Sequence, residues 1–179
     1  MRSLSSVVHQ IGALLLVFSL YMLLPAVTAI YYREPEALRA FVAGAVLSAA
    51  CGLLIHFATL KFRTDLKPRD GYLLVTLAWL AVATVAAVPL LMLLPGLSFT
   101  RAFFESMSGL STTGATVLTG LDQLPHAINL WRHALSWLGG LGIIVMAVAI
   151  LPLLGIGGMQ MYRADAPGSI KDTKLAPRI

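Results

Sequence analysis

Long apolar runs separated by short polar links dominate this chain. A membrane-spanning helix needs about 20 mostly apolar residues. Four stretches reach that length: Val7–Ile30, Leu38–Leu60, Tyr72–Leu94 and Leu130–Gly155. The first is longer than the apolar part of a signal peptide and has no clear cleavage pattern at its end, so we expect it to be retained. The pattern predicts an all-α membrane protein.

The connection between the third and fourth runs does not have the pattern of a simple turn. Phe99, Phe103 and Met107 recur near the helical period, and Ser98 is a suitable N-cap. A helix of about thirteen residues reaches only ~20 Å, which is short of a ~30 Å hydrocarbon core. We therefore predict a short helix that enters the bilayer from outside, followed by a segment that returns to the same side.

The predicted return path begins with a small, hydroxyl-rich sequence, Thr112-Thr113-Gly114-Ala115-Thr116. Non-helical backbone at membrane depth is tolerated only when it is buried in protein or lines a water-filled cavity. Extended backbone there can offer successive carbonyl oxygens to a cation in place of its water shell. The negative end of the short helix favours a cation as well. These residues are candidate ligands for a monovalent cation, although a capped loop packed against a helical bundle fits the same pentapeptide.

Composition and charge support a membrane setting and suggest an orientation. The chain is 58% hydrophobic and 12% charged, whereas soluble domains carry about 25% charged residues. Nine of the 13 basic residues lie at the N-terminus, in residues 61–69 or in the tail after Met159. Because basic residues accumulate on the cytoplasmic side of membrane helices, we expect both termini there. The charge of +5 is dispersed between apolar runs, which argues against nucleic-acid binding.

Aromatic residues near the ends of the predicted spans suggest where the lipid head groups lie. Tyr31, Tyr32 and Trp131 fall where an outer interfacial belt is expected. Trp137 lies deeper in the fourth run, so we expect it to pack inside the protein.

The sequence has no pattern typical of an enzyme. Its single cysteine, Cys51, excludes an internal disulfide and a cysteine-rich metal site. It also lacks a phosphate-binding loop, a dinucleotide fingerprint, a catalytic-triad order and paired carboxylates. We therefore expect no catalytic residues and no organic cofactor.

Two features near the candidate cation ligands have alternative interpretations. Glu105 is ionisable and lies within the short helix, so it either supports the neighbouring backbone or pairs with Arg101 one turn earlier. Gly139, Gly140 and Gly142 either make the fourth span flexible or, as is more usual for small residues, allow close helix packing.

Three segments together resemble one family. Residues Phe104–Thr116 resemble the first pore loop of the TrkH/TrkG potassium-uptake proteins, Trp137–Val145 resembles the start of the following helix, and Ile170–Ile179 resembles the connection to the second repeat. The family belongs to a superfamily that also holds the KtrB and plant HKT transporters. The resemblance implies that potassium is the transported ion and that Thr112 to Thr116 form part of its selectivity filter.

The resemblance also implies an organisation. Residues 1–66 would form an N-terminal pair of transmembrane helices, and residues 67–179 the first of four helix–pore-loop–helix repeats in a protein of the bacterial inner membrane. Gly114 aligns with the glycine of the filter, while Glu105 and Ser111 would support the filter. A cytosolic nucleotide-binding ring protein would regulate transport.

Length separates this chain from the family pattern. Three of the four repeats are missing, and one loop lines only about a quarter of a four-loop potassium filter. We therefore expect a fragment or a truncated form, while pairing with another polypeptide and tetramerisation through the single repeat are alternatives. Passive potassium permeation is the leading interpretation. Ion-coupled transport and a non-conducting structural or regulatory subunit are the other two.

Overall fold

The described part of the chain contains six α-helices and one 3-10 helix, and it contains no β-strand. The computed structural model describes residues 2–60 and 68–153. Its elements, in order, are α1 (Arg2–Tyr21), α2 (Leu23–Tyr31), α3 (Pro35–Thr59), α4 (Pro68–Leu93), α5 (Phe99–Leu110), η2 (Leu121–Gln123) and α6 (His126–Leu153). The prediction of an all-α protein is confirmed.

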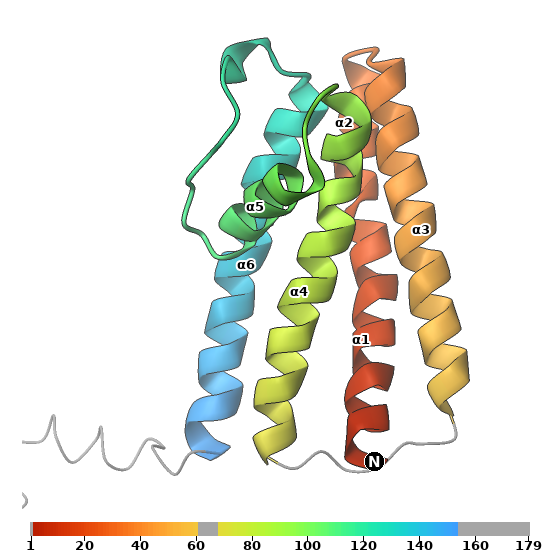
Figure 1. Cartoon of the computed structure of the whole chain (residues 1–179), viewed down its shortest axis with the longest axis vertical. Helices are drawn as coiled ribbons and strands as arrows, with labels where there is room; N and C mark the ends of the chain where they lie inside the picture. Colours follow the sequence, from red (N-terminus) through yellow and green to blue (C-terminus); the bar gives the residue numbers. More distant parts are fainter. Residues whose placement is uncertain (1, 61–67, 154–179) are drawn as a thin grey trace, which may run out of the picture.

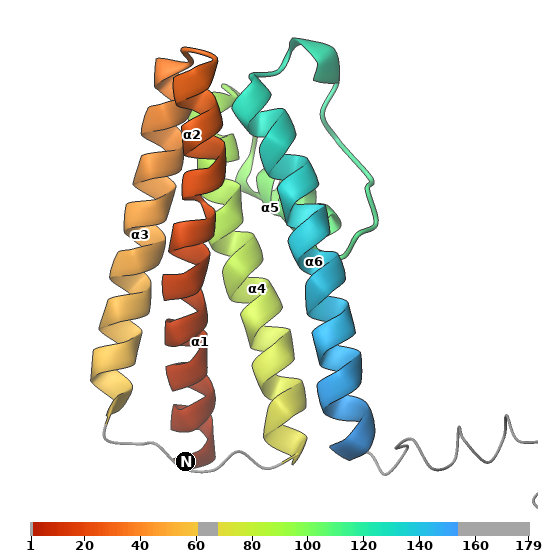
Figure 2. The same ribbon diagram turned by 180° about the vertical axis from the view of Figure 1, so that it is seen from behind.

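Four long rods run side by side and alternate in direction (Figures 1 and 2). α1 and α2 together form the first rod, and α3, α4 and α6 form the others. Within the described residues, three stretches are long and apolar enough to cross a membrane: Leu4–Tyr31, Pro35–Thr59 and Asp70–Leu93. The fourth predicted span corresponds to α6, which is 28 residues long. Its predicted end, Gly155, and the tail that follows lie outside the described residues.

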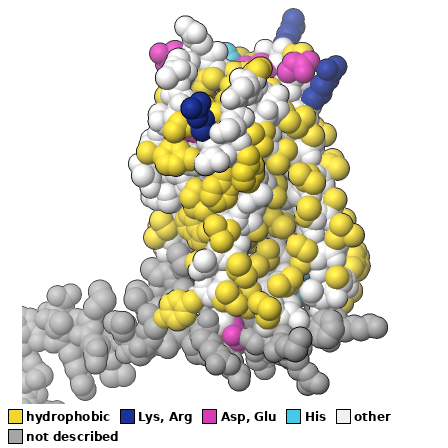
Figure 3. Space-filling model, in the orientation of Figure 1, with side chains coloured by type: hydrophobic (Ala, Val, Ile, Leu, Met, Phe, Trp, Pro, Cys, Tyr) yellow, Lys and Arg dark blue, Asp and Glu magenta, His cyan; other side chains and the backbone are white. Residues whose placement is uncertain are grey.

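Hydrophobic side chains cover much of the face of the bundle that Figure 3 shows. Val17, Leu54 and Phe57 are among the large apolar residues that are mostly exposed. Most of the visible charged side chains gather at the end where α2 and α3 meet (Figure 3). A continuous apolar surface of this kind is unfavourable in water and suits lipid.

The first rod is not one continuous helix. α1 ends at Tyr21 and α2 begins at Leu23. Pro25 has no N–H, so the carbonyl of Tyr21 cannot receive the usual hydrogen bond from four residues ahead, and the proline ring crowds the same turn. The predicted single span Val7–Ile30 is therefore divided, with the interruption about one turn before the proline.

Each of the four rods begins about one turn earlier than the apolar pattern predicts, α4 and α6 among them. α4 starts at Pro68 rather than Tyr72, and α6 starts at His126 rather than Leu130. Hydrophobic periodicity marks the apolar part of a helix and misses a polar first turn. Pro68 suits the first helical position, where no hydrogen bond is expected from its nitrogen.

An aromatic cluster joins the N-terminal helix pair to α6. The ring of Trp131 lies 5.7 Å from that of Phe18, 6.1 Å from that of Tyr21 and 5.6 Å from that of Phe41, measured between centroids. The indole N–H of Trp131 donates to the carbonyl of Ala86 in α4 at 3.1 Å. Trp131 is therefore a core residue that contacts three of the four rods.

Two of the aromatic predictions are wrong. Trp131 is fully buried instead of lying in an interfacial belt, and Trp137, which was expected to pack inside, is 64% exposed. Tyr31 and Tyr32 are exposed, as residues of an interfacial belt should be. Position along an apolar run indicates depth, but it does not show which face of the helix meets its neighbours, and that face decides burial.

Candidate functional site

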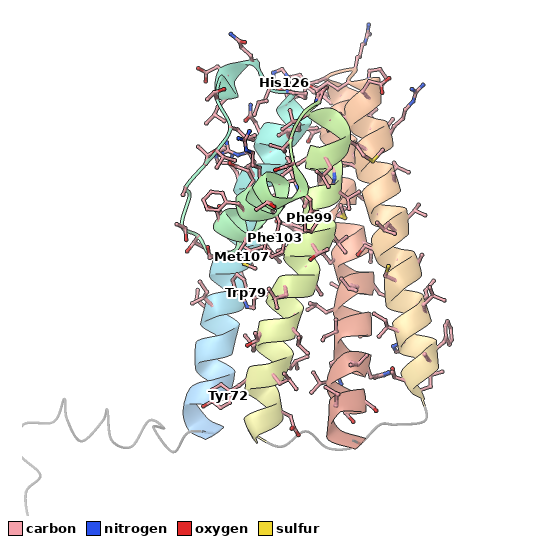
Figure 4. The ribbon with its side chains drawn as sticks, viewed as in Figure 1. Tyr72, Trp79, Phe99, Phe103, Met107 and His126 are labelled. Carbon is pink, nitrogen blue, oxygen red and sulfur yellow. The ribbon has the colours of Figure 1, made fainter. Side chains whose placement is uncertain are left out.

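α5 and the segment after it begin and end at the same end of the bundle. After α4 reaches that end, α5 runs back beside the upper part of α6, and residues 111–120 return to the level where α6 begins (Figures 1 and 2). Phe99, Phe103 and Met107 lie along α5 (Figure 4). With 12 residues, α5 is about 18 Å long, too short to cross a ~30 Å hydrocarbon core.

The start of α5 agrees with the sequence prediction. Ser98 is its N-cap, and the hydroxyl of Ser98 accepts a hydrogen bond from the N–H of Arg101 at 3.4 Å. A serine at this position satisfies one of the N–H groups that a helix start leaves without a partner.

The end of α5 turns sharply into residues 112–117, which we call the return segment. The carbonyl of Ser108 accepts hydrogen bonds from the N–H groups of Thr113 at 3.0 Å and Gly114 at 3.3 Å. Thr112 and Gly114 have positive φ angles of 57° and 73°. This region is open to glycine and unfavourable for a β-branched residue. A Cβ at position 114 would meet no atom within 4 Å. The positive φ angle, rather than a lack of space, therefore favours glycine at this position.

Serine side chains connect the return segment to α5. The hydroxyl of Ser108 donates to the carbonyl of Ala115 at 2.7 Å. The hydroxyl of Ser111 lies 2.8 Å from that of Thr113. Ser111 was predicted as a supporting residue from its place in the motif, whereas Ser108 has no counterpart among the sequence predictions.

A buried carboxylate holds the far end of the return segment. Glu105 of α5 is 4% exposed. Its Oε1 accepts hydrogen bonds from Thr116 Oγ1 at 2.6 Å and from the backbone N–H of Val117. Its Oε2 accepts a hydrogen bond from Nε of Arg132 in α6 at 3.3 Å. One carboxylate thus joins α5, α6 and the return segment.

Arg132 is absent from the sequence predictions of site residues. Among the described residues the ion pair of Glu105 is with Arg132, and the alternative pair with Arg101 is not formed. Arg101 is exposed, whereas a buried carboxylate needs a partner that is buried beside it. The side chain of Arg132 is 18% exposed. A basic residue two turns into an otherwise apolar helix was the signal in the sequence.

The return segment presents carbonyl oxygens without partners. The carbonyls of Thr112, Thr113, Gly114 and Thr116 accept no hydrogen bond from other described residues, and all four residues are exposed. Ala115 differs, because its carbonyl accepts the Ser108 hydroxyl. Backbone carbonyls rarely lack a partner away from water. Water, an ion or another protein segment must therefore satisfy these oxygens.

Gly139 of α6 permits the close approach of α5. A Cβ at this position would lie 1.8 Å from the carbonyl oxygen of Leu110, far inside van der Waals contact. At Gly140 the nearest atom to an added Cβ is in Thr112 at 3.9 Å, and at Gly142 it is in Trp79 at 4.0 Å. Close packing therefore accounts for Gly139, while Gly140 and Gly142 have room for a methyl group.

The available ligands are backbone and hydroxyl oxygens. Within residues 2–60 and 68–153, no three His, Cys, Asp or Glu side chains come together as a metal site. Neutral oxygens of this kind can replace the hydration shell of an alkali cation.

Known proteins resemble this chain over nearly all of its length. Residues 37–179 match the TrkH family model, which is described as a cation transport protein. The Trk system potassium uptake protein TrkH of Vibrio parahaemolyticus is 49% identical over 97% of this chain, and TrkG of Escherichia coli is 41% identical over 97%. Each match covers 36% of the relative, so the chain spans about a third of their length.

A solved structure has the same fold. The crystal structure of the potassium transporter TrkH from Vibrio parahaemolyticus matches with a TM-score of 0.80 and 44% identity, over 90% of this chain and 36% of that one. These relatives are transport proteins, which agrees with the expectation that the chain is not an enzyme.

Proposed function

Because this chain belongs to the TrkH family of cation transport proteins, we propose that it serves in potassium transport and contributes one strand of a potassium filter. α5 is then a pore helix that enters the bilayer from outside, and the return segment leads back to the same side. Thr112 to Thr116 form the filter strand, with Glu105, Ser108 and Ser111 supporting it from behind.

The unpartnered carbonyls of the return segment are the observation that carries this proposal. A potassium filter uses backbone oxygens to replace the water around the ion, and those of Thr112, Thr113 and Gly114 are exposed and accept no hydrogen bond from other described residues. The segment is also held at both ends, by Ser108 and by Glu105. The oxygen of Ala115 is held by Ser108, which makes it the weakest of the proposed ligands.

The proposal requires more protein than this chain. One strand supplies about a quarter of a filter formed by four loops, and the relatives are nearly three times as long as the part matched here. We propose that further repeats complete the pore in the bacterial inner membrane, with both termini cytoplasmic. By resemblance, residues 1–66 form the additional helix pair, residues 67–179 the first repeat, and a cytosolic nucleotide-binding ring protein regulates transport.

Replacing the filter glycine tests the proposal. The protein to use joins this chain to the remaining two thirds of the Vibrio parahaemolyticus relative and is expressed in cells that lack potassium uptake. Gly114→Ser places a side chain at φ 73°, a strain on the order of 1–2 kcal/mol that should displace the neighbouring carbonyls. We expect uptake measurements to show a loss of potassium-over-sodium selectivity on the order of tenfold.

Gly96 provides a matched control. It has a φ of 81° and also has no atom within 4 Å of an added Cβ, but it lies between α4 and α5. Gly96→Ser should cost similar stability and leave selectivity unchanged. Equal selectivity in the two variants would contradict the filter assignment.

A further inference from the structure

α6 begins without a cap of its own. The first N–H groups of a helix need acceptors, which an Asp, Asn, Ser or Thr side chain at the N-cap usually provides. Pro125 precedes His126, and its side chain has no oxygen. The carbonyl of Pro125 accepts the N–H groups of Ile128 and Asn129 at 3.0 and 3.1 Å. The N–H groups of His126 and Ala127 therefore need an acceptor from elsewhere.

Glu34, between α2 and α3, supplies this acceptor from a distant part of the sequence. Its carboxylate accepts the N–H of His126 at 2.7 Å and that of Ala127 at 3.1 Å, and it lies 2.9 Å from Nδ1 of the His126 ring. The ring of Tyr32 stacks on that imidazole with centroids 3.9 Å apart. His126 lies at the same end of the bundle as the start of α3 (Figure 4). A carboxylate here also faces the positive end of the α6 dipole.

The charge state of Glu34 agrees with this geometry. Partial burial alone would raise the pKa of Glu34, but the hydrogen bonds from Ala127 and His126 outweigh it and hold that pKa below its ordinary value. Glu34 is therefore ionised at neutral pH, as a capping carboxylate should be.

α6, whose first turn Glu34 caps, also contains Arg132, the ion-pair partner of Glu105. Arg132 follows His126 by six residues, which is about 9 Å along the helix axis. Its guanidinium pairs with Glu105, which in turn holds the return segment. A series of polar contacts thus leads from the N-terminal helix pair to the proposed filter.

Other contacts hold the same part of α6 from the side. The hydroxyl of Tyr21 donates to the carbonyl of Ala134 at 2.6 Å, and Trp131 packs against Phe18 and Phe41. These contacts limit the lateral movement of α6. Glu34 instead contacts the first turn of α6, through the N–H groups of His126 and Ala127.

We infer that Glu34 is a positioning residue for the return segment: by capping α6 it places Arg132, and Arg132 places Glu105 and the backbone that Glu105 holds. The N-terminal helix pair then sets the geometry of the ion path without contributing a ligand. The functional consequence rests on the proposed potassium filter, whereas the positioning itself concerns only the contacts of this chain.

Hydrogen exchange on the chain in lipid nanodiscs tests the positioning. Glu34→Gln removes the charge and one acceptor oxygen. Glu36→Gln is the matched control, because Glu36 is exposed and pairs with Arg39 on its own helix at 3.1 Å. We expect Glu34→Gln to speed exchange several-fold at the amides of residues 126–128 and of the return segment. Glu36→Gln should leave both unchanged.

A second substitution distinguishes capping from a general loss of stability. Pro125→Asp supplies a local capping carboxylate, so Glu34→Gln combined with Pro125→Asp should restore slow exchange in the return segment. If Glu34→Gln speeds exchange only at residues 126–128, Glu34 caps α6 without positioning the return segment, and the inference is overturned. A uniform increase in the exchange rate over α1 to α4 would overturn it as well. Glu34→Asp, whose carboxylate is one methylene further from α6, gives the same comparison if Glu34→Gln does not fold.

The functional consequence is measured in the joined protein used for the filter test. Glu34→Gln should lower potassium-over-sodium selectivity several-fold, and Glu36→Gln should not. Adding Pro125→Asp to Glu34→Gln should restore the selectivity. Poor selectivity in the parent protein would count against the filter assignment, and the exchange experiment would still decide the positioning. Good selectivity in the parent, with no effect of Glu34→Gln on exchange or selectivity, would overturn the positioning alone.

Discussion

Glu105 is buried with its charge satisfied by two separate parts of the chain. One carboxylate oxygen accepts hydrogen bonds from the return segment, and the other accepts a hydrogen bond from Arg132. Removing one member of a buried pair leaves the other without compensation, which costs more than the pair itself contributes. The arrangement therefore depends on both partners being present together.

Substituting the two members of this pair should show coupling between them. We expect Glu105→Gln and Arg132→Gln each to lower the free energy of unfolding by about 1–3 kcal/mol. The double variant should lose less than the sum of the two, because the second substitution removes a group that is already unpaired. Unfolding of the chain in mixed detergent micelles measures all three.

Arg101 provides the control for charge alone. It is exposed, so Arg101→Gln should change the free energy of unfolding by less than about 0.5 kcal/mol. Strict additivity of the Glu105 and Arg132 substitutions, or a coupling of Glu105 to Arg101 instead, would contradict the pairing.

At the scale of elements, the contact between α5 and α6 depends on backbone meeting backbone. The end of α5 lies against Gly139, where α6 has no side chain to hold it away. This close approach puts Arg132, about two turns earlier on α6, within reach of Glu105. Two neighbouring glycines, Gly139 and Gly140, allow the requirement to be tested.

Alanine at these two positions should have opposite effects. Gly139→Ala forces a methyl group into the carbonyl of Leu110, so we expect a loss of about 1–3 kcal/mol in the free energy of unfolding. Gly140→Ala has space, with its nearest contact at 3.9 Å, and should gain up to about 1 kcal/mol from higher helix propensity. The same micelle unfolding assay ranks the two variants. Equal losses would indicate that flexibility, rather than packing, requires both glycines.

At the scale of the whole molecule, the proposed re-entry of α5 has a topological consequence. The connection between α2 and α3 and the short helix η2 lie at the same end of the bundle (Figure 1). If α5 enters the bilayer and the return segment leaves on the same side, both regions face the same compartment. A segment that crossed the membrane would place them in different compartments.

Cysteine labelling distinguishes these two topologies. Cys51→Ser gives a background without cysteine, and single cysteines can then replace Glu36, Asp122 or Arg63. We expect an impermeant maleimide to label Glu36→Cys and Asp122→Cys in intact cells, and Arg63→Cys only after permeabilisation. If Asp122→Cys, like Arg63→Cys, were labelled only after permeabilisation, re-entry of α5 would be ruled out, and the filter assignment would fail with it.

The sequence by itself determined the features that depend on local pattern. Apolar runs of membrane length predicted the rods, and the short helical period after the third run predicted α5 with Ser98 as its cap. Gly114 was expected to lie in the small, hydroxyl-rich stretch that follows this helix, and its φ angle there is positive. These predictions succeeded because helix formation, capping and the allowed φ range depend on residues within a few positions of one another.

Tertiary structure decided the contacts that connect distant residues. Glu105 pairs with Arg132, 27 positions away, instead of Arg101, one helical turn away, and Glu34 caps a helix that begins 92 positions later. Trp131 rather than Trp137 is buried for the same reason. A single sequence gives the spacing of side chains along each helix but not the rotation of one helix against another. That rotation determines which charged side chains are brought close enough to pair when the helices pack.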